Sequence, residues 1–170
     1  MCGIAGFSLF HKNYPHELVV IARRMAVAVA HRGPDDSGAW ADSTLGVAFA
    51  HQRLAILDLS ASGHQPMHSA SGRYVIAFNG EIYNHLSIRG ELEAARFVSN
   101  WRGHSDTETL LAAIEAWGLD DALHRCTGMW AIALVDRRER LLHLVRDRFG
   151  EKPLYWGITG SDQQLSLIHI

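Results

Sequence analysis

The hydrophobic positions of this chain form short apolar runs that alternate with polar turns. These runs predict strands at residues 4–10, 45–50, 54–59, 74–78, 129–135 and 141–145. The run 129–135 is almost entirely apolar, so we expect a strand that is covered on both faces. The polar residues 136–139 separate the last two runs and predict a hairpin.

Other segments repeat their apolar residues at helical spacing. They predict helices over residues 15–30, 86–97 and 110–117. The segment SDTE (105–108) has the pattern of a capping box ahead of the third helix, and Gly118 is a stop signal after it. Strands flanked by helices predict a layered arrangement with mostly antiparallel sheets, and 170 residues fit one domain.

Composition narrows the class of protein. The chain has 48% hydrophobic and 20% charged residues, which is typical of a globular protein. A formal net charge of −2 gives no electrostatic basis for binding nucleic acid or an anionic membrane. Two cysteines do not make a disulfide framework, and the sequence contains no recognisable secretory signal or membrane-spanning run. We therefore expect a cytoplasmic protein.

The chain begins MCGIAGF, so removal of Met1 makes Cys2 the first residue. A nucleophile in that place has a base on its own backbone, because an α-amino group with a pKa of ~7.7–8.0 is partly unprotonated at neutral pH. The thiol can then attack a carbonyl carbon while the amine accepts and returns the proton. A cysteine near an N-terminus is more often an ordinary thiol, so the rest of the chain must decide.

Asn79 and Gly80 follow an apolar run and have two interpretations. A type I′ turn is the default for this dipeptide and the more frequent outcome. The alternative is an oxyanion hole, in which the Asn79 amide and the Gly80 N–H donate to the oxygen of an attacked carbonyl.

Three charged residues also have two interpretations each. Arg53 is either a surface ion-pair partner or a bidentate clamp on a substrate carboxylate. Asp106 either complements the dipole of the predicted helix or pairs with a substrate ammonium group. Glu81 either shares that second task or is an acidic residue in a turn.

Metal and nucleotide binding find no support in the sequence. Eleven histidines are present, and His64 and His68 have helical ligand spacing, but Pro66 lies between them. There is no Cys/His cluster with zinc spacing, and there is no glycine-rich phosphate loop with its lysine. We predict no metal site and no cofactor in this chain.

Seven segments together resemble the glutaminase domain of the asparagine synthetase family, which belongs to the class II glutamine amidotransferases. They are MCGIAGF, HRGPDDSG, HQRLAILDLS with GHQPM, YVIAFNGEIYNH, SDTETLL, GMWAIALVD and RDRFGEKPLYW. They occur in the order of the family. The resemblance implies an α+β fold, the N-terminal nucleophile hydrolase αββα four-layer sandwich with two antiparallel sheets. It also implies that Cys2 is the nucleophile and that Asn79 and Gly80 form the oxyanion hole.

The resemblance further implies how glutamine is held. Arg53 binds the α-carboxylate, while Glu81 and Asp106 contact the α-amino end, and Asn79 and Gly80 also touch the substrate. The pocket lining comes from the backbone around Leu54, Ile56 and Leu57. The HRGPDD loop is expected to support the site, and RDRFGEKPLYW is expected to be either structural, at a domain interface, or a solvated turn.

The chain also departs from the family pattern. The family continues into an ATP-dependent synthetase domain with an SGGxDS loop, which is absent here, so ATP and magnesium are expected there. Residues 1–164 are expected to be an amidotransferase domain incomplete at its C-terminus, with sheet edges left uncovered. Residues 165–170 (LSLIHI) match a translated transposon-end sequencing adapter and are expected to be an adapter-derived tail.

The expected partners are glutamine and the synthetase domain of the same chain, with a homodimer as one expected state of the full-length protein. We expect no nucleic-acid and no membrane partner. The expected activity is hydrolysis of glutamine to supply ammonia for amidation of aspartate. Two alternatives stay open: a family member that amidates another acceptor, such as a polysaccharide sugar acid, and a non-catalytic glutamine-binding scaffold.

Overall fold

Two antiparallel sheets lie face to face between helices in this computed structural model, which describes residues 2–9, 17–159 and 164–169. The first sheet has the strand order β2 (Asp36–Asp42), β3 (Val47–Arg53), β1 (Gly3–Ser8), β9 (Gln164–His169) and β8 (Tyr155–Thr159). The second has the order β4 (Met67–His68), β5 (Tyr74–Ile82), β6 (Gly128–Asp136) and β7 (Leu141–Arg146).

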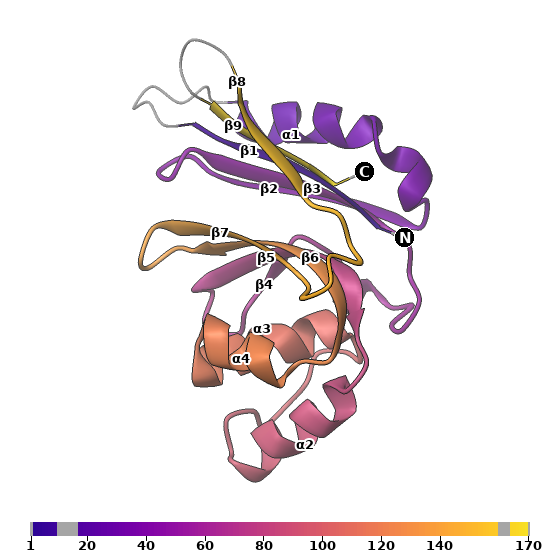
Figure 1. Cartoon of the computed structure of the whole chain (residues 1–170), viewed down its shortest axis with the longest axis vertical. Helices are drawn as coiled ribbons and strands as arrows, with labels where there is room; N and C mark the ends of the chain where they lie inside the picture. Colours follow the sequence, from indigo (N-terminus) through magenta and orange to yellow (C-terminus); the bar gives the residue numbers. More distant parts are fainter. Residues whose placement is uncertain (1, 10–16, 160–163, 170) are drawn as a thin grey trace.

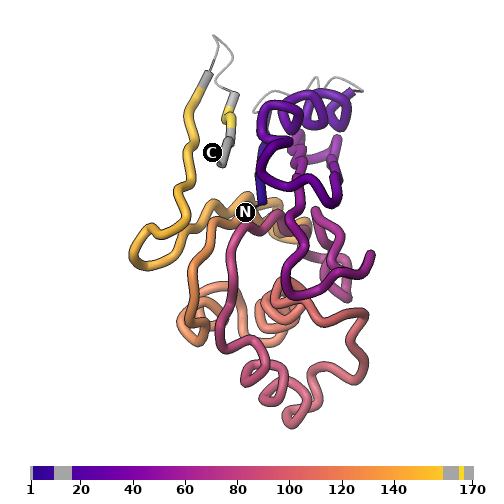
Figure 2. Tube along the Cα trace, turned by 90° about the vertical axis from the view of Figure 1, so that its right-hand side faces the viewer, coloured from indigo at the N-terminus to yellow at the C-terminus, as the bar shows by residue number. Residues whose placement is uncertain are grey.

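Helices cover both outer faces of this pair of sheets (Figure 1). Helix α1 (Leu18–Val27) lies on the first sheet, while α3 (Asp106–Trp117) and α4 (Leu119–Arg125) lie on the second, with α2 (His85–Ala94) farther out. In the side view of Figure 2, α1 and α2 lie at opposite ends of the long axis. The predicted αββα four-layer sandwich is therefore confirmed. No helix in the described part of the chain is long and apolar enough to cross a bilayer.

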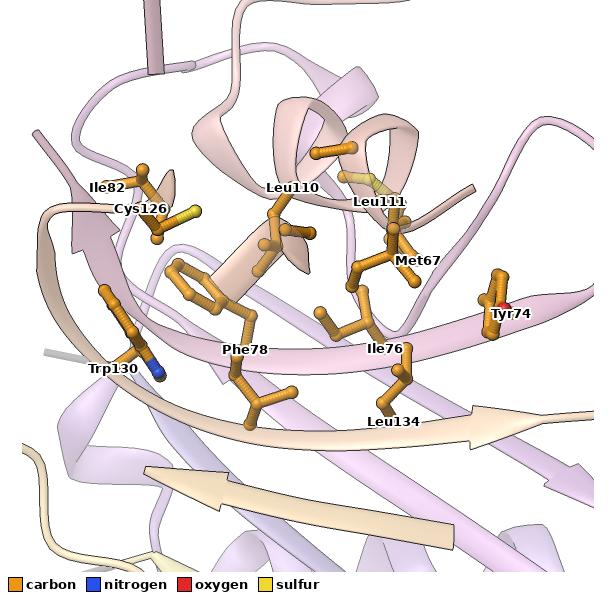
Figure 3. Packing of buried hydrophobic residues seen from close by; sticks show 14 of the residues in the cluster. Met67, Tyr74, Ile76, Phe78, Ile82, Leu110, Leu111, Cys126, Trp130 and Leu134 are labelled. Atoms are coloured by element: carbon orange, nitrogen blue, oxygen red, sulfur yellow. The ribbon is translucent and has the colours of Figure 1, made fainter. Parts of the chain in front are cut away.

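Three apolar layers hold these elements together, because successive side chains of a strand point to opposite faces. Along β3, Phe49 packs in the layer between the two sheets, whereas Ala48 and Ala50 pack against α1. The largest layer lies between the second sheet and its helices. Figure 3 shows Leu110 and Leu111 of α3 facing β5 there.

Helix α3 begins and ends where the sequence predicts. The Ser105 hydroxyl accepts a hydrogen bond from the Glu108 N–H at 3.2 Å, and Gly118 ends the helix with a φ of 83°. The other half of the capping box differs, because the Glu108 carboxylate accepts from the N–H groups of Arg102 and Gly103 instead. The loop before the helix is thereby fixed on its first turn.

The predicted strands at 45–50 and 54–59 are wrong in their boundaries. A single strand, β3, runs from Val47 to Arg53, and residues 54–59 form an irregular loop. The guanidinium of Arg53 donates hydrogen bonds to the carbonyls of Asp58 and Ser60. The apolar pattern of residues 54–59 does not reveal that this loop folds around the Arg53 side chain.

Asn79 and Gly80 do not form the turn that is the default for this dipeptide. Strand β5 continues through both residues to Ile82, and Gly80 is paired with Trp130 of β6. A Cβ atom on Gly80 would lie 2.2 Å from the Met129 carbonyl oxygen, so the glycine permits a close approach of the two strands.

Several elements differ from or add to the sequence predictions. Strands β2, β4, β8 and β9 and helix α4 were not predicted, and β2 begins at Asp36, within the HRGPDDSG segment. Strand β9, which contains residues 165–169 of the expected adapter-derived tail, pairs with β1 on one side and with β8 on the other. The predicted helix 15–30 is shorter, at Leu18–Val27, and its expected start at Pro15 lies outside the described residues, as do residues 10 and 170.

Candidate active site

One pocket gathers every residue that the sequence assigns to the site. It is lined by Cys2, Arg53, Leu54, Ile56, Leu57, Asn79, Gly80, Glu81 and Asp106. The rest of its lining was not assigned to the site and consists of Asp58, Gly63, Gln65, Phe78, Ser105, Thr107, Met129 and Lys152. The pocket therefore joins the end of β3 and the loop after it to β5 and to the first turn of α3.

Cys2 lies directly before β1, at the end of β3. The register that pairs Gly3 with Gln52 brings its thiol to Leu54, whose N–H donates to the sulfur at an N–Sγ distance of 3.4 Å. The Nε of Arg32 donates to the Cys2 carbonyl oxygen at 3.1 Å and fixes the backbone of that residue. Burial raises the pKa of the Cys2 thiol, and the Leu54 hydrogen bond only partly opposes this. The thiol is therefore protonated at neutral pH and needs a base to become a nucleophile.

The edge of β5 that borders the pocket offers one N–H group to a ligand. In an antiparallel strand, alternate N–H groups point to the same edge. The N–H of Phe78 donates to Gln65 Oε1 at 2.7 Å, and the N–H of Ile82 donates to Asp106 Oδ2 at 2.9 Å. Gly80 lies between these two residues, so its N–H points to the same edge, into the pocket.

The Asn79 side chain points toward the first sheet. Ala77, two residues earlier on β5, belongs to the apolar layer between the sheets together with Ile4 of β1. Strand alternation places Asn79 on the same face as Ala77, and places Cys2 on the same face as Ile4. Cys2 and the Asn79 amide thus face each other from different sheets, with Asn79 only 2% exposed.

Arg53 is held in place at the pocket wall by the loop that follows it. Its Nη1 donates to the Ser60 carbonyl at 2.9 Å, and its Nη2 donates to the carbonyl of Asp58. A Cβ atom on Gly63 would lie 2.0 Å from Nη2, so a larger residue there would displace the guanidinium from this place. Burial acts to raise the pKa of Asp58, but hydrogen bonds from Ser60 and from the His104 N–H lower it to about 2.

Asp106 is a buried carboxylate at the start of α3. Its Oδ2 accepts from the Ile82 N–H and its Oδ1 accepts from the Thr107 N–H, both at 2.9 Å. Burial raises the pKa of Asp106, and these two hydrogen bonds act against that rise. A cationic guanidinium and an acidic side chain therefore share one pocket, as a zwitterionic ligand requires.

The sequence matches a known protein family along almost its whole length. The sequence profile of the glutamine amidotransferase domain matches residues 1–167. This chain is a member of that family. It is 38% identical over 168 residues to asparagine synthetase [glutamine-hydrolyzing] 3 of Bacillus subtilis, covering 95% of this chain and 25% of the relative. It is 42% identical over 142 residues to a putative asparagine synthetase [glutamine-hydrolyzing] of Mycobacterium tuberculosis, covering 78% of this chain and 21% of the relative.

The amidotransferase domain also has a similar solved fold. Glutamine phosphoribosylpyrophosphate amidotransferase of B. subtilis superposes with a TM-score of 0.78 at 20% identity, covering 98% of this chain and 41% of that chain. This likeness supports the N-terminal nucleophile hydrolase fold expected from the sequence. The amidotransferase domain spans about a quarter of the length of the curated relatives described above.

Lys152 is a pocket residue of the amidotransferase domain that sequence reasoning missed. It belongs to the segment RDRFGEKPLYW, and a signal was present, because the chain has only one other lysine, Lys12. Although burial would raise the pKa of Asp147, its carboxylate accepts the N–H groups of Trp130, Phe149, Glu151 and Lys152, and these bonds keep the pKa low. This turn places Lys152 in the pocket wall, so the segment contributes to the site.

The HRGPDD loop of the amidotransferase domain lies directly behind the pocket. The Asp35 N–H donates to the Arg53 carbonyl at 3.0 Å, and Asp35 Oδ2 accepts the Ala55 N–H at 2.8 Å. Together with the Arg32 contact to Cys2, these bonds fix Cys2 relative to Arg53. Among the described residues, no three His, Cys, Asp or Glu side chains cluster as metal ligands would.

Proposed function

We propose that this domain hydrolyses the side-chain amide of free glutamine to glutamate and ammonia, as the glutaminase part of an asparagine synthetase. The observation that carries the proposal is the arrangement of Cys2 on one sheet opposite Asn79 and Gly80 on the other, in one pocket. Relatives named as glutamine-hydrolysing asparagine synthetases support the choice of substrate.

The reaction begins when the α-amino group of Cys2, freed by loss of Met1, takes the thiol proton. The sulfur attacks the side-chain carbonyl carbon of glutamine, and the oxyanion receives hydrogen bonds from the Asn79 amide and the Gly80 N–H. One such donor lowers the barrier by about 2.7–4 kcal/mol. The amine returns the proton to the leaving nitrogen, and ammonia departs. Water then hydrolyses the γ-glutamyl thioester and regenerates Cys2.

Selection of free glutamine follows from the charges at the two ends of the pocket. Arg53 binds the α-carboxylate, and Asp106, aided by Glu81, binds the α-ammonium group. A glutamine within a peptide lacks both free groups, so it leaves a buried guanidinium and a buried carboxylate without their partners.

The molecule that accepts the ammonia is proposed to bind in a synthetase domain and not in this domain. The proposed acceptor is aspartate activated with ATP and magnesium in a synthetase domain, in the cytoplasm. The names of the relatives favour aspartate over the alternative, another acid such as a sugar acid.

The test is active-site labelling and hydrolysis with Cys2→Ala. The chain with Met1 removed, as verified by mass spectrometry, should release glutamate from glutamine, and a diazoketone analogue of glutamine should add covalently to Cys2. Cys2→Ala should lose both activities, because no other thiol lines the described pocket. Cys126→Ala is the matched control, since it removes a buried thiol outside the pocket and should keep both. Labelling or turnover that survives in Cys2→Ala would contradict the proposal, and binding of glutamine without either would favour the scaffold alternative.

A further inference from the structure

His51 is a fully buried histidine that the reaction described above does not use. It lies on β3 with 0% exposure, on the face that points between the two sheets. Its Nε2 lies 3.0 Å from the carbonyl oxygen of Phe78 on β5. The side chain therefore joins a strand of the first sheet to a strand of the second inside the sandwich.

The protonation state of His51 follows from this contact. A carbonyl oxygen can only accept, so Nε2 carries the proton and donates it. Burial lowers the pKa of His51 to about 4, which keeps the ring neutral and leaves Nδ1 as a bare acceptor. No described residue gives Nδ1 a hydrogen-bond partner. A buried acceptor without a partner costs stability, so a wholly apolar side chain would fill this space at lower cost.

The carbonyl that His51 holds is next to the proposed oxyanion hole. Phe78 directly precedes Asn79, and both of its peptide groups are bound by side chains, the N–H by Gln65 and the carbonyl by His51. Backbone pairing of β5 on this edge ends at Ile76, which is the partner of Met67 on β4. Side chains thus replace a neighbouring strand at the point where Asn79 and Gly80 begin.

The backbone of His51 is fixed relative to Cys2. On β3, His51 is paired with Ile4 of β1, and Ile4 lies two residues after Cys2. The pairing of β1 with β3 therefore fixes the position of His51 relative to Cys2. The hydrogen bond from His51 to Phe78 then fixes the position of β5 relative to both residues.

We propose that His51 is a positioning residue that sets the oxyanion hole opposite Cys2 through its hydrogen bond to the Phe78 carbonyl. This inference rests on the proposed glutamine hydrolysis. Catalysis by oriented groups is sensitive to small displacements, and a shift of about 1 Å lowers rates by up to about 10²-fold. Loss of the bond should therefore slow formation of the oxyanion while leaving the Arg53 and Asp106 contacts with glutamine in place, because other backbone groups anchor those two side chains.

The test compares His51→Leu and His51→Gln in the chain with Met1 removed. Leucine removes the donor, whereas the terminal amide of glutamine places a donor near the position of Nε2. We expect His51→Leu to lower kcat for glutamine hydrolysis by about 10- to 100-fold with KM changed by less than about twofold. His51→Gln should recover most of kcat. Alkylation of Cys2 by iodoacetamide, which needs no oxyanion hole, should keep its wild-type rate in both variants.

Two controls separate positioning from packing. Phe49→Leu changes a core side chain on the same strand and face, and it should lower the melting temperature without a selective loss of kcat. If His51→Leu does not fold, His51→Gln is compared with His51→Asn, whose shorter amide falls short of the Phe78 oxygen and should be the slower variant.

Several outcomes would overturn the inference. They are a wild-type kcat in His51→Leu, a His51→Gln variant as slow as His51→Leu, and an alkylation rate that falls in parallel with kcat. A wild-type chain that releases no glutamate would instead contradict the proposed function, and the inference with it. The two failures are therefore distinguishable.

Discussion

At the scale of single residues, the site depends on side chains whose own positions are fixed by backbone groups. Arg53 is anchored by two carbonyls of the loop after β3, and Asp106 is anchored by the N–H groups of Ile82 and Thr107. Such anchoring gives both charges a constant place in the pocket before a ligand arrives. Pre-ordering of this kind lowers the entropy that binding must overcome.

Replacement of Arg53 by lysine tests the proposed carboxylate clamp. Lysine keeps the positive charge but lacks the planar fork, so it cannot both hold the loop carbonyls and bind a carboxylate with two parallel hydrogen bonds. We expect Arg53→Lys to raise the KM for glutamine by about tenfold or more, with a smaller effect on kcat. Steady-state kinetics of glutamate release measures both, and an unchanged KM would remove Arg53 from the site.

At the scale of elements, the loop 54–63 and the start of α3 are joined by Asp58. Its Oδ1 accepts from the Ser60 N–H and hydroxyl, and its Oδ2 accepts from the His104 N–H just before the helix. Asp58 therefore holds together two segments that are more than forty residues apart in the sequence. These hydrogen bonds fix the distance between the segment after Arg53 and the segment before Asp106.

The pKa of Asp58 predicts a stability contribution with a defined pH range. The folded value of about 2 lies below the usual unfolded value of ~3.9, so the carboxylate stabilises the fold above about pH 4. That contribution is lost as the pH falls toward 2. We expect Asp58→Asn to lower the free energy of unfolding by on the order of 2 kcal/mol at pH 6, with the difference from wild type shrinking between pH 4 and 2.

Urea unfolding at several pH values measures this difference. Asp121→Asn, which changes an exposed aspartate of α4, is the control and should cost much less at pH 6. A difference between Asp58→Asn and wild type that is the same at pH 6 and pH 2 would contradict the assignment.

At the scale of the whole molecule, the proposed nucleophile and the proposed oxyanion hole are positioned by different sheets. Cys2 is fixed by β1 and β3, whereas Asn79 and Gly80 are fixed by β5 and β6. The apolar layer between the sheets, which includes Ile4, keeps the two halves at a constant separation. Activity therefore requires the complete sandwich and not one sheet alone.

This dependence predicts that activity and global structure are lost together. We expect a single cooperative thermal transition, with glutamine hydrolysis lost in the same temperature range as the circular dichroism signal of the strands. Activity that disappears well before that signal would show that the two sheets separate, or the pocket opens, in an earlier step.

Much of the site could be predicted because its residues lie in short sequence motifs. Local sequence left two interpretations open for Cys2, Arg53 and Asp106, and the family resemblance placed them in the site; all three line one pocket. Gln65 and Lys152 were missed, since each enters the pocket through contacts with distant segments. The Gln65 amide reaches β5, and the turn bearing Lys152 is formed by hydrogen bonds to Asp147.

The sequence by itself determined the strand that directly follows Cys2, the capped start of α3 and the layered class of the fold, because each depends on neighbours in the chain. Only the tertiary structure decided that Asn79 and Gly80 continue a strand. Local geometry permits an Asn-Gly turn or an extended strand, and pairing with β6 together with the Gln65 and Asp106 contacts selects the strand. The place of His51 was decided in the same way, since its partner Phe78 lies on the other sheet and no local pattern joins the two.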